Sequence, residues 1–135
     1  MARAVHRDML TLFDRLLEVE GVPAQRSDLE IAHDPPYIER VAACSREAAA
    51  ADTVLELEGD GRVSGASWDA LLAAVGCVLT AVDRVEQGEA RNAFCAVRPP
   101  GHGAGATAPG DFSIFNGAAI AALRAVRRAP ATPVW

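Results

Sequence analysis

Residues 95–104 read Cys-Ala-Val-Arg-Pro-Pro-Gly-His-Gly-Ala, and residues 112–117 read Phe-Ser-Ile-Phe-Asn-Gly. Residues 93–97 form a short apolar run that ends at the Pro-Pro pair, a pattern typical of a strand buried on both faces of a parallel sheet. The two prolines have no N–H for a strand ladder, so they end the strand and hold the chain extended. We therefore expect Gly101-His102-Gly103 to follow the carboxyl end of a strand, where open α/β sheets place their sites.

Helical periodicity predicts a helix on each side of this stretch. The first covers residues 67–85, with Ser67 as its N-cap and Gly88 as its stop. Its apolar positions repeat at helical spacing: Leu71, Leu72, Val75, Leu79, Val82 and Val85. The second covers residues 116–128, where small alanines favour close packing against a sheet, and Pro130 ends it. Helices alternating with a strand indicate α/β layering.

The amino-terminal part of the chain predicts three further helices. Leu10, Phe13, Leu16 and Leu17 indicate a helix over residues 8–20. Residues 27–30, Ser-Asp-Leu-Glu, match a capping box that begins a short helix. Asp34 followed by Pro35 predicts the start of another helix. His33 lies between these two helices, and we interpret it as a packing or capping residue because no second metal ligand lies four positions away.

Composition limits the class of protein. The chain has 135 residues, a net charge of −5 and a pI near 5.1. This length suits one domain, residues 1–135. Scattered arginines and an acidic balance argue against direct nucleic-acid binding, and no apolar run is long enough for a membrane span.

The start lacks the apolar core of a signal peptide, so a cytoplasmic protein is expected. Three widely spaced cysteines are expected to be reduced core residues.

The motif Arg-Pro-Pro-Gly-His, followed by Phe-x-x-Phe-Asn and an alanine-rich helix, resembles the histone deacetylase and acetylpolyamine amidohydrolase family, on its class II-like bacterial side. The resemblance extends back through Ser67-Trp68 to residues 33–38, His-Asp-Pro-Pro-Tyr-Ile. It implies an α/β arginase/deacetylase-like fold, with a parallel sheet flanked by helices. It also implies zinc-dependent hydrolysis of acetyl-lysine or acetylated polyamine amides. Since the family domain is more than twice as long, we expect a partial domain, truncated at both ends.

The resemblance also assigns candidate site residues. His102 matches the first of the family's two adjacent histidines, and Gly103 stands where the second, the better candidate for general base, should be. Phe112 matches the aromatic wall of the acyl-lysine channel, with Gly101 beside it. Ser113 replaces the family's usual cysteine in that channel. The departure at Gly103 falls on the proton-transfer step, and losing a general base typically costs about 10² to 10⁴ in rate.

The ligands for a catalytic zinc are not found in this sequence. Such a site needs three protein ligands and an open position for water. The family takes them from an Asp-x-His segment and a further Asp, both after the helix that begins near Asn116. No Asp, Glu, His or Cys follows Asp111, and the three histidines belong to separate predicted segments. We therefore expect no metal or cofactor in this chain, although the complete family domain uses zinc, and we expect no activity from it alone.

Two other readings remain open. Residues 101–106 fit a loose G-x-G-x-x-A dinucleotide fingerprint, but Pro109-Gly110 interrupts the helix that this motif requires. Alternatively, the chain is a non-catalytic remnant or partner-binding module, or the product of a truncated gene, because two prolines follow the last helix where the family has a strand. Unpaired sheet edges would then favour self-association.

Overall fold

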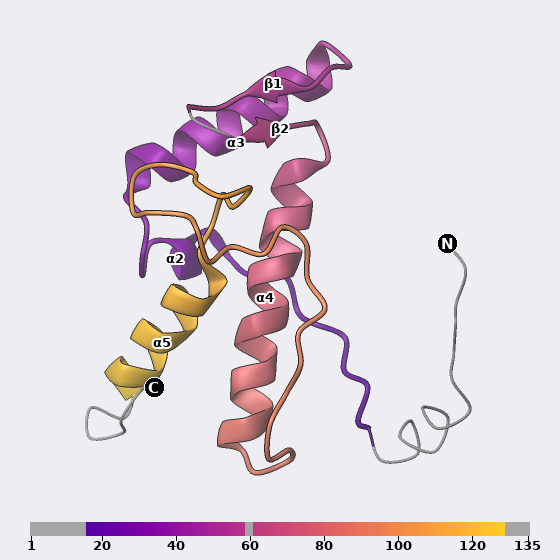
Figure 1. Cartoon of the computed structure of the whole chain (residues 1–135), viewed down its shortest axis with the longest axis vertical. Helices are drawn as coiled ribbons and strands as arrows, with labels where there is room; N and C mark the ends of the chain where they lie inside the picture. The colour runs from indigo at the N-terminus through magenta and orange to yellow at the C-terminus, as the bar shows by residue number, and fades with distance from the viewer. Residues whose placement is uncertain (1–15, 59–60, 129–135) are drawn as a thin grey trace.

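The computed structural model describes residues 16–58 and 61–128. The elements in chain order are α2 (Arg26–Leu29), α3 (Pro35–Ala50), β1 (Leu55–Glu56), β2 (Arg62–Val63), α4 (Ser67–Glu86) and α5 (Gly117–Arg128). In Figure 1, α3 lies near the start of the long helix α4, and α2 and α5 lie on one side of α4. The predicted helices over residues 67–85 and 116–128 are confirmed as α4 and α5. The predicted N-cap of the first is wrong by one position, because Ala66 is the N-cap and Ser67 is already helical. None of the described helices is long and apolar enough to cross a membrane.

The segment before α2 crosses α4 at very short range. The backbone N–H of Ala24 donates to the carbonyl of Leu72, 2.9 Å away. Gly76 makes this approach possible, because a β-carbon built on it would overlap the carbonyl oxygen of Val22. A glycine that lowers helix propensity in the middle of α4 is therefore required by packing.

The helix α3 and the hairpin after it are fixed to the start of α4 by one buried serine. The hydroxyl of Ser45 donates to the carbonyl of Ser64 over 2.9 Å and accepts the backbone N–H of Trp68 over 3.2 Å. The hairpin pairs Leu55 with Val63 in antiparallel register. As predicted, Asp34 occupies the N-cap position of α3 and Pro35 its first turn.

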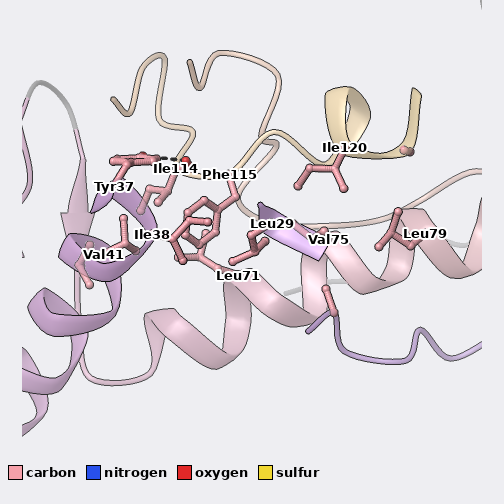
Figure 2. Close-up of a cluster of buried hydrophobic side chains, with 13 residues drawn as sticks. Leu29, Tyr37, Ile38, Val41, Leu71, Val75, Leu79, Ile114, Phe115 and Ile120 are labelled. Atoms are coloured by element: carbon pink, nitrogen blue, oxygen red, sulfur yellow. Dashed lines mark hydrogen bonds between the residues drawn. The ribbon is translucent and has the colours of Figure 1, made fainter. Parts of the chain in front are cut away.

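One apolar core joins α2, α3, α4, α5 and the loop before α5 (Figure 2). Its members share near-complete burial: Leu29, Tyr37, Ile38, Val41, Val63, Leu71, Val75, Leu79, Ile114, Phe115 and Ile120. Trp68 packs against Phe115 edge-to-face with ring centroids 6.0 Å apart, so this tryptophan has a packing role. The predicted apolar stripe of α4 thus faces this core from Leu71 to Val82, whereas Val85, its last predicted member, is exposed.

Ion pairs join α4 to α5 along the side of this core. Asp83 on α4 accepts hydrogen bonds from Arg124 at 2.6 Å and from Arg128 at 2.7 Å. Arg124 also donates to the carbonyl of Leu79 over 2.9 Å. Since the side chain of Arg124 is largely buried, this charge-assisted cluster fixes how α5 lies on α4.

The predicted strand over residues 93–97 is not formed, and the described residues contain no parallel sheet. Residues 89–97 instead return along α4 as an extended segment whose Phe94 is 93% exposed. A strand exists only when a neighbour accepts and donates its hydrogen bonds, and no other strand lies beside this segment in residues 16–58 or 61–128. The sequence indicated the apolar run correctly, but the parallel sheet predicted around it is not formed by the described residues.

Two predictions in the amino-terminal part also need correction. The predicted helix over residues 8–20 falls mainly outside the described residues, and its described end, residues 16–20, is not helical. The capping box lies two residues earlier than predicted: Gln25 is the N-cap of α2, and its backbone N–H donates to the carboxylate of Asp28 over 2.8 Å. The backbone N–H of Gln25 has no acceptor within the helix, so the Asp28 carboxylate accepts its hydrogen bond.

We predict that Gly76→Ala destabilises the chain by about 3 kcal/mol, because backbone of the crossing segment occupies the space of the new methyl group. Helix propensity alone would predict that the change from glycine to alanine stabilises the chain. Chemical denaturation measures the difference. The matched control is Gly105→Ala, where the new β-carbon would meet only an oxygen at 3.7 Å, and an equal loss in that variant would contradict the packing explanation.

Candidate functional site

The candidate site is the loop of residues 98–116, which α3 holds in place from one side. The Tyr37 hydroxyl donates to the carbonyl of Ile114 over 2.8 Å, drawn as a dashed line in Figure 2. Arg40 donates to the carbonyl of Thr107 over 2.9 Å. The backbone N–H of Asp34 donates to the carbonyl of Ala106 over 3.0 Å. The motif at residues 33–38 and the loop motif are therefore one structural unit.

Ser113 organises the interior of the loop. Its side chain is 1% exposed, and its oxygen accepts the backbone N–H groups of Gly101 at 3.0 Å and Gly103 at 3.3 Å. Gly101 has a φ of +90°, and a β-carbon there would meet the carbonyl oxygen of Phe115 at 2.5 Å. Only glycine fits that position without strain. One hydroxyl thus joins the two halves of the motif.

Position 103, where the resemblance predicts the family's second histidine, has no space for a side chain in this structure. A β-carbon on Gly103 would lie 2.6 Å from both the carbonyl oxygen of Gly110 and the β-carbon of Asp111. These distances are shorter than van der Waals contact, so no side chain fits at this position. The loop has folded into the space that a residue with a side chain at this position would need.

A tight turn over residues 110–113 displays Phe112. Backbone N–H groups of Gly110 and Ser113 donate to each other's carbonyl groups at 3.0 and 2.8 Å. Asp111 and Phe112 between them have φ values of 45° and 58°, the left-handed signs that a type I′ turn requires. An aromatic residue rarely adopts this conformation. The turn leaves the Phe112 side chain 79% exposed.

His33 anchors the end of the loop at the start of α5. Its ring is buried against Tyr37 and Phe115, and its Nε2 accepts the backbone N–H of Asn116 over 2.9 Å. The Asn116 side chain in turn accepts the N–H of Ala119 and donates to the carbonyl of Ala104. This confirms the interpretation of His33 as a packing residue. Its hydrogen bond to the loop was missed.

Burial lowers the pKa of His33, although the carbonyl groups of Gly105 and Ala106 and the Asp34 carboxylate favour the charged ring. The hydrogen bond from Asn116 agrees with this direction, because Nε2 can accept it only while that nitrogen is unprotonated. The folded chain therefore holds a neutral imidazole.

A pocket of about 470 Å³ lies between the loop, the hairpin and the start of α4. Its described lining is Glu56, Gly61, Arg62, Ser67, Ala70, Leu71, Arg98, Pro99, Phe112 and Ile114. Phe112 and Ile114 give it an apolar wall, and Arg98 adds a cation. Of the predicted site residues, Phe112 lines this pocket. Gly101 and Ser113 shape the loop behind it. The side chain of His102 is exposed and does not line the pocket.

The described residues do not fit a zinc site. No group of three His, Cys, Asp or Glu side chains gathers anywhere in residues 16–58 and 61–128. His33 and His102 are the only histidines among them. The Nε2 atom of His33 is already bonded to Asn116, and the ring is buried. The donor set that tetrahedral zinc requires is therefore not assembled by this part of the chain.

Sequence reasoning missed that Asn116 is the residue on which the loop depends. An Asn directly before an alanine-rich helix is a recognisable N-cap signal. The pairing of its backbone with His33, 83 positions earlier, is a tertiary contact without a local signature.

We predict that the free energy of unfolding falls as the pH drops below about 6.5, because the unfolded chain then protonates His33 while the folded chain resists it. The contribution of His33 to the free energy of unfolding is fully present above that pH and is lost as the pH falls below it. Denaturation at pH values from about 7 to about 5.5 measures the slope. His33→Gln keeps an acceptor without titrating, so its slope should be smaller. His102→Gln, at an exposed side chain, should match the unmodified chain.

We predict that Ser113→Ala costs about 1–3 kcal/mol, because the change leaves the N–H groups of Gly101 and Gly103 without their acceptor inside the loop. Thermal or chemical denaturation gives the value. Ser27→Ala removes the same atom from an exposed position and should change stability by less than about 0.5 kcal/mol. Equal effects of the two changes would refute the organising role of Ser113.

Comparison with known proteins agrees with this geometry. Residues 2–133 match the histone deacetylase domain. Histone deacetylase 8 of Arabidopsis thaliana is 33% identical over 101 residues, which cover 75% of this chain and 26% of that protein. Acetylpolyamine amidohydrolase 1 of Pseudomonas aeruginosa is 41% identical over 59 residues, which cover 44% of this chain and 17% of that protein.

Among solved structures, the HDA15 HD domain is similar to this chain with a TM-score of 0.76 and 26% sequence identity. The similarity covers 85% of this chain and 32% of that chain, so the residues described above correspond to about a third of the solved domain. The likeness shows a partial arginase/deacetylase-like fold. Because the domain match includes the loop and the helices that hold it, this chain belongs to the histone deacetylase family.

Proposed function

We propose that this chain forms one wall of an acyl-amide site of the deacetylase type and does not itself supply the hydrolytic machinery. The observation that supports the proposal is the closure of the loop at Gly103, where neighbouring backbone occupies the space for a side chain. The loop is well ordered by hydrogen bonds around Ser113 and Asn116, so it presents a formed surface. The surface carries His102, but glycine stands at position 103, where the resemblance expects the second histidine, the better candidate for general base.

The ligand class we propose is the acyl end of an N-acetylated lysine or polyamine. Phe112 and Ile114 offer an apolar wall to a methyl group and an alkyl chain, and the pocket beside them is of ligand size. Relatives support this class by name, since they include an acetylpolyamine amidohydrolase and the polyamine deacetylase HDAC10 of Danio rerio. This chain covers only 17% and 8% of those proteins, respectively.

A partner-binding role is a second candidate, supported by the extended segment of residues 89–97. The N–H groups of residues 90–96 donate no hydrogen bond to the described part of the chain. Phe94 on this segment is almost fully exposed. The dinucleotide reading has less support, because residues 101–106 lead into the turn at 110–113 and α5 begins only at Gly117.

We predict that the purified chain of 135 residues does not hydrolyse an acetyl-lysine peptide or N-acetylputrescine above the buffer rate, with zinc added. One physical reason is the lack of the second histidine as general base, worth about 10² to 10⁴ in rate. The other is that residues 16–58 and 61–128 assemble no group of metal ligands. Release of acetate measures turnover. Turnover that a hydroxamate inhibits would refute the proposed lack of activity.

Binding is tested separately from turnover. Titration of the chain with N-acetyl-lysine amide should shift NMR signals of Phe112 and Ile114, and Phe112→Ala should weaken the effect. The matched control is Phe94→Ala, which removes an exposed aromatic outside the pocket lining. An absence of shifts at millimolar ligand would refute the acyl-binding wall and favour the partner-binding role.

A further inference from the structure

Two of the three cysteines lie side by side at the contact between α4 and the extended segment. Cys77 is on α4, and Cys95 is on the segment that returns along it. The Sγ atom of Cys95 lies 3.9 Å from the carbonyl oxygen of Cys77. The Cys77 side chain, after burial, contributes to raising the pKa of Cys95. Both thiols are free and half-buried, where core residues had been expected.

The backbone around Cys95 is the least constrained part of this contact. The N–H groups of residues 90–96 donate no hydrogen bond to other described residues, so a small shift of the segment breaks no ladder. A disulfide requires β-carbons about 3.5–4.5 Å apart, and movement of this segment is the motion that would bring the pair together. Cys44 lies on α3, in a different part of the chain, and serves as an internal reference thiol.

From this juxtaposition we propose that Cys77 and Cys95 are a disulfide-forming pair, a modification site for low-molecular-weight disulfides such as oxidised glutathione. One thiol loses its proton, and its thiolate attacks the glutathione disulfide, which forms a mixed disulfide and releases one glutathione thiolate. The second cysteine thiolate then attacks the mixed disulfide and releases the other glutathione. The protein loses two electrons and two protons, and one glutathione disulfide becomes two thiols.

The cross-link would fix the segment that leads into the candidate site. Cys95 is three residues before Arg98, which lines the pocket, and the bond would close a loop of 18 positions. Closing such a loop restricts the unfolded chain. Burial and the neighbouring Cys77 raise the pKa of Cys95, so the thiolate is scarce at neutral pH. The reaction is therefore slow there, and its rate should increase with pH.

The test treats the full chain, under native conditions, with oxidised glutathione at two pH values, and then blocks remaining thiols with iodoacetamide. Intact mass and a non-reducing peptide map identify the product. We expect a Cys77–Cys95 linkage with Cys44 alkylated, faster formation at the higher pH, and a melting temperature raised by roughly 5–10 °C, reversed by dithiothreitol.

Two variants make the assignment specific. Cys44→Ser should retain the linkage, whereas Cys95→Ser should abolish it and leave Cys77 either free or as a glutathione adduct. Circular dichroism verifies that each variant is folded, and Cys77→Ser replaces Cys95→Ser where needed. The proposal is overturned by a stable glutathione adduct without ring closure in the unmodified chain, by a linkage to Cys44, or by both thiols remaining free.

Discussion

The hydrogen bond from the Asn116 backbone to Nε2 of His33 is the contact on which the candidate site depends. It joins the connection between α2 and α3 to the start of α5, where the loop of residues 98–116 ends. Tyr37 adds a second bond to the same loop two residues earlier, at Ile114. Because both anchoring side chains are buried in the aromatic cluster around Phe115, the loop cannot move without disturbing the core.

This anchoring explains why a loop with so many small residues has one conformation. Backbone groups of Gly101 and Gly103 would otherwise need water, but Ser113 accepts both of them inside the loop. The same close packing also limits which residues fit in the loop. The space beside Gly103 is filled by Gly110 and Asp111, so no residue with a side chain fits at this position in this arrangement. The order of the loop and the exclusion of a side chain at position 103 therefore have one cause.

The extended segment of residues 89–97 shows the opposite situation. Its apolar composition is that of a buried strand, yet Phe94 is exposed and the segment contacts mainly α4. Strand structure depends on a neighbour in a way that helix structure does not, since a helix makes its hydrogen bonds within itself. The helices α4 and α5 form where their periodicity predicts, whereas the strand does not. The contact between Cys77 and Cys95 arises because the segment lies against α4.

The sequence by itself determined the helices α4 and α5, the start of α3 at Asp34-Pro35, and the family, because these depend on local spacing, capping residues and a distinctive motif. Only the tertiary structure decided that His33 accepts a bond from Asn116, that backbone fills the space at Gly103, and that His102 lies outside the pocket. The physical reason is that these features join residues far apart in the chain. No local pattern encodes which distant atoms meet.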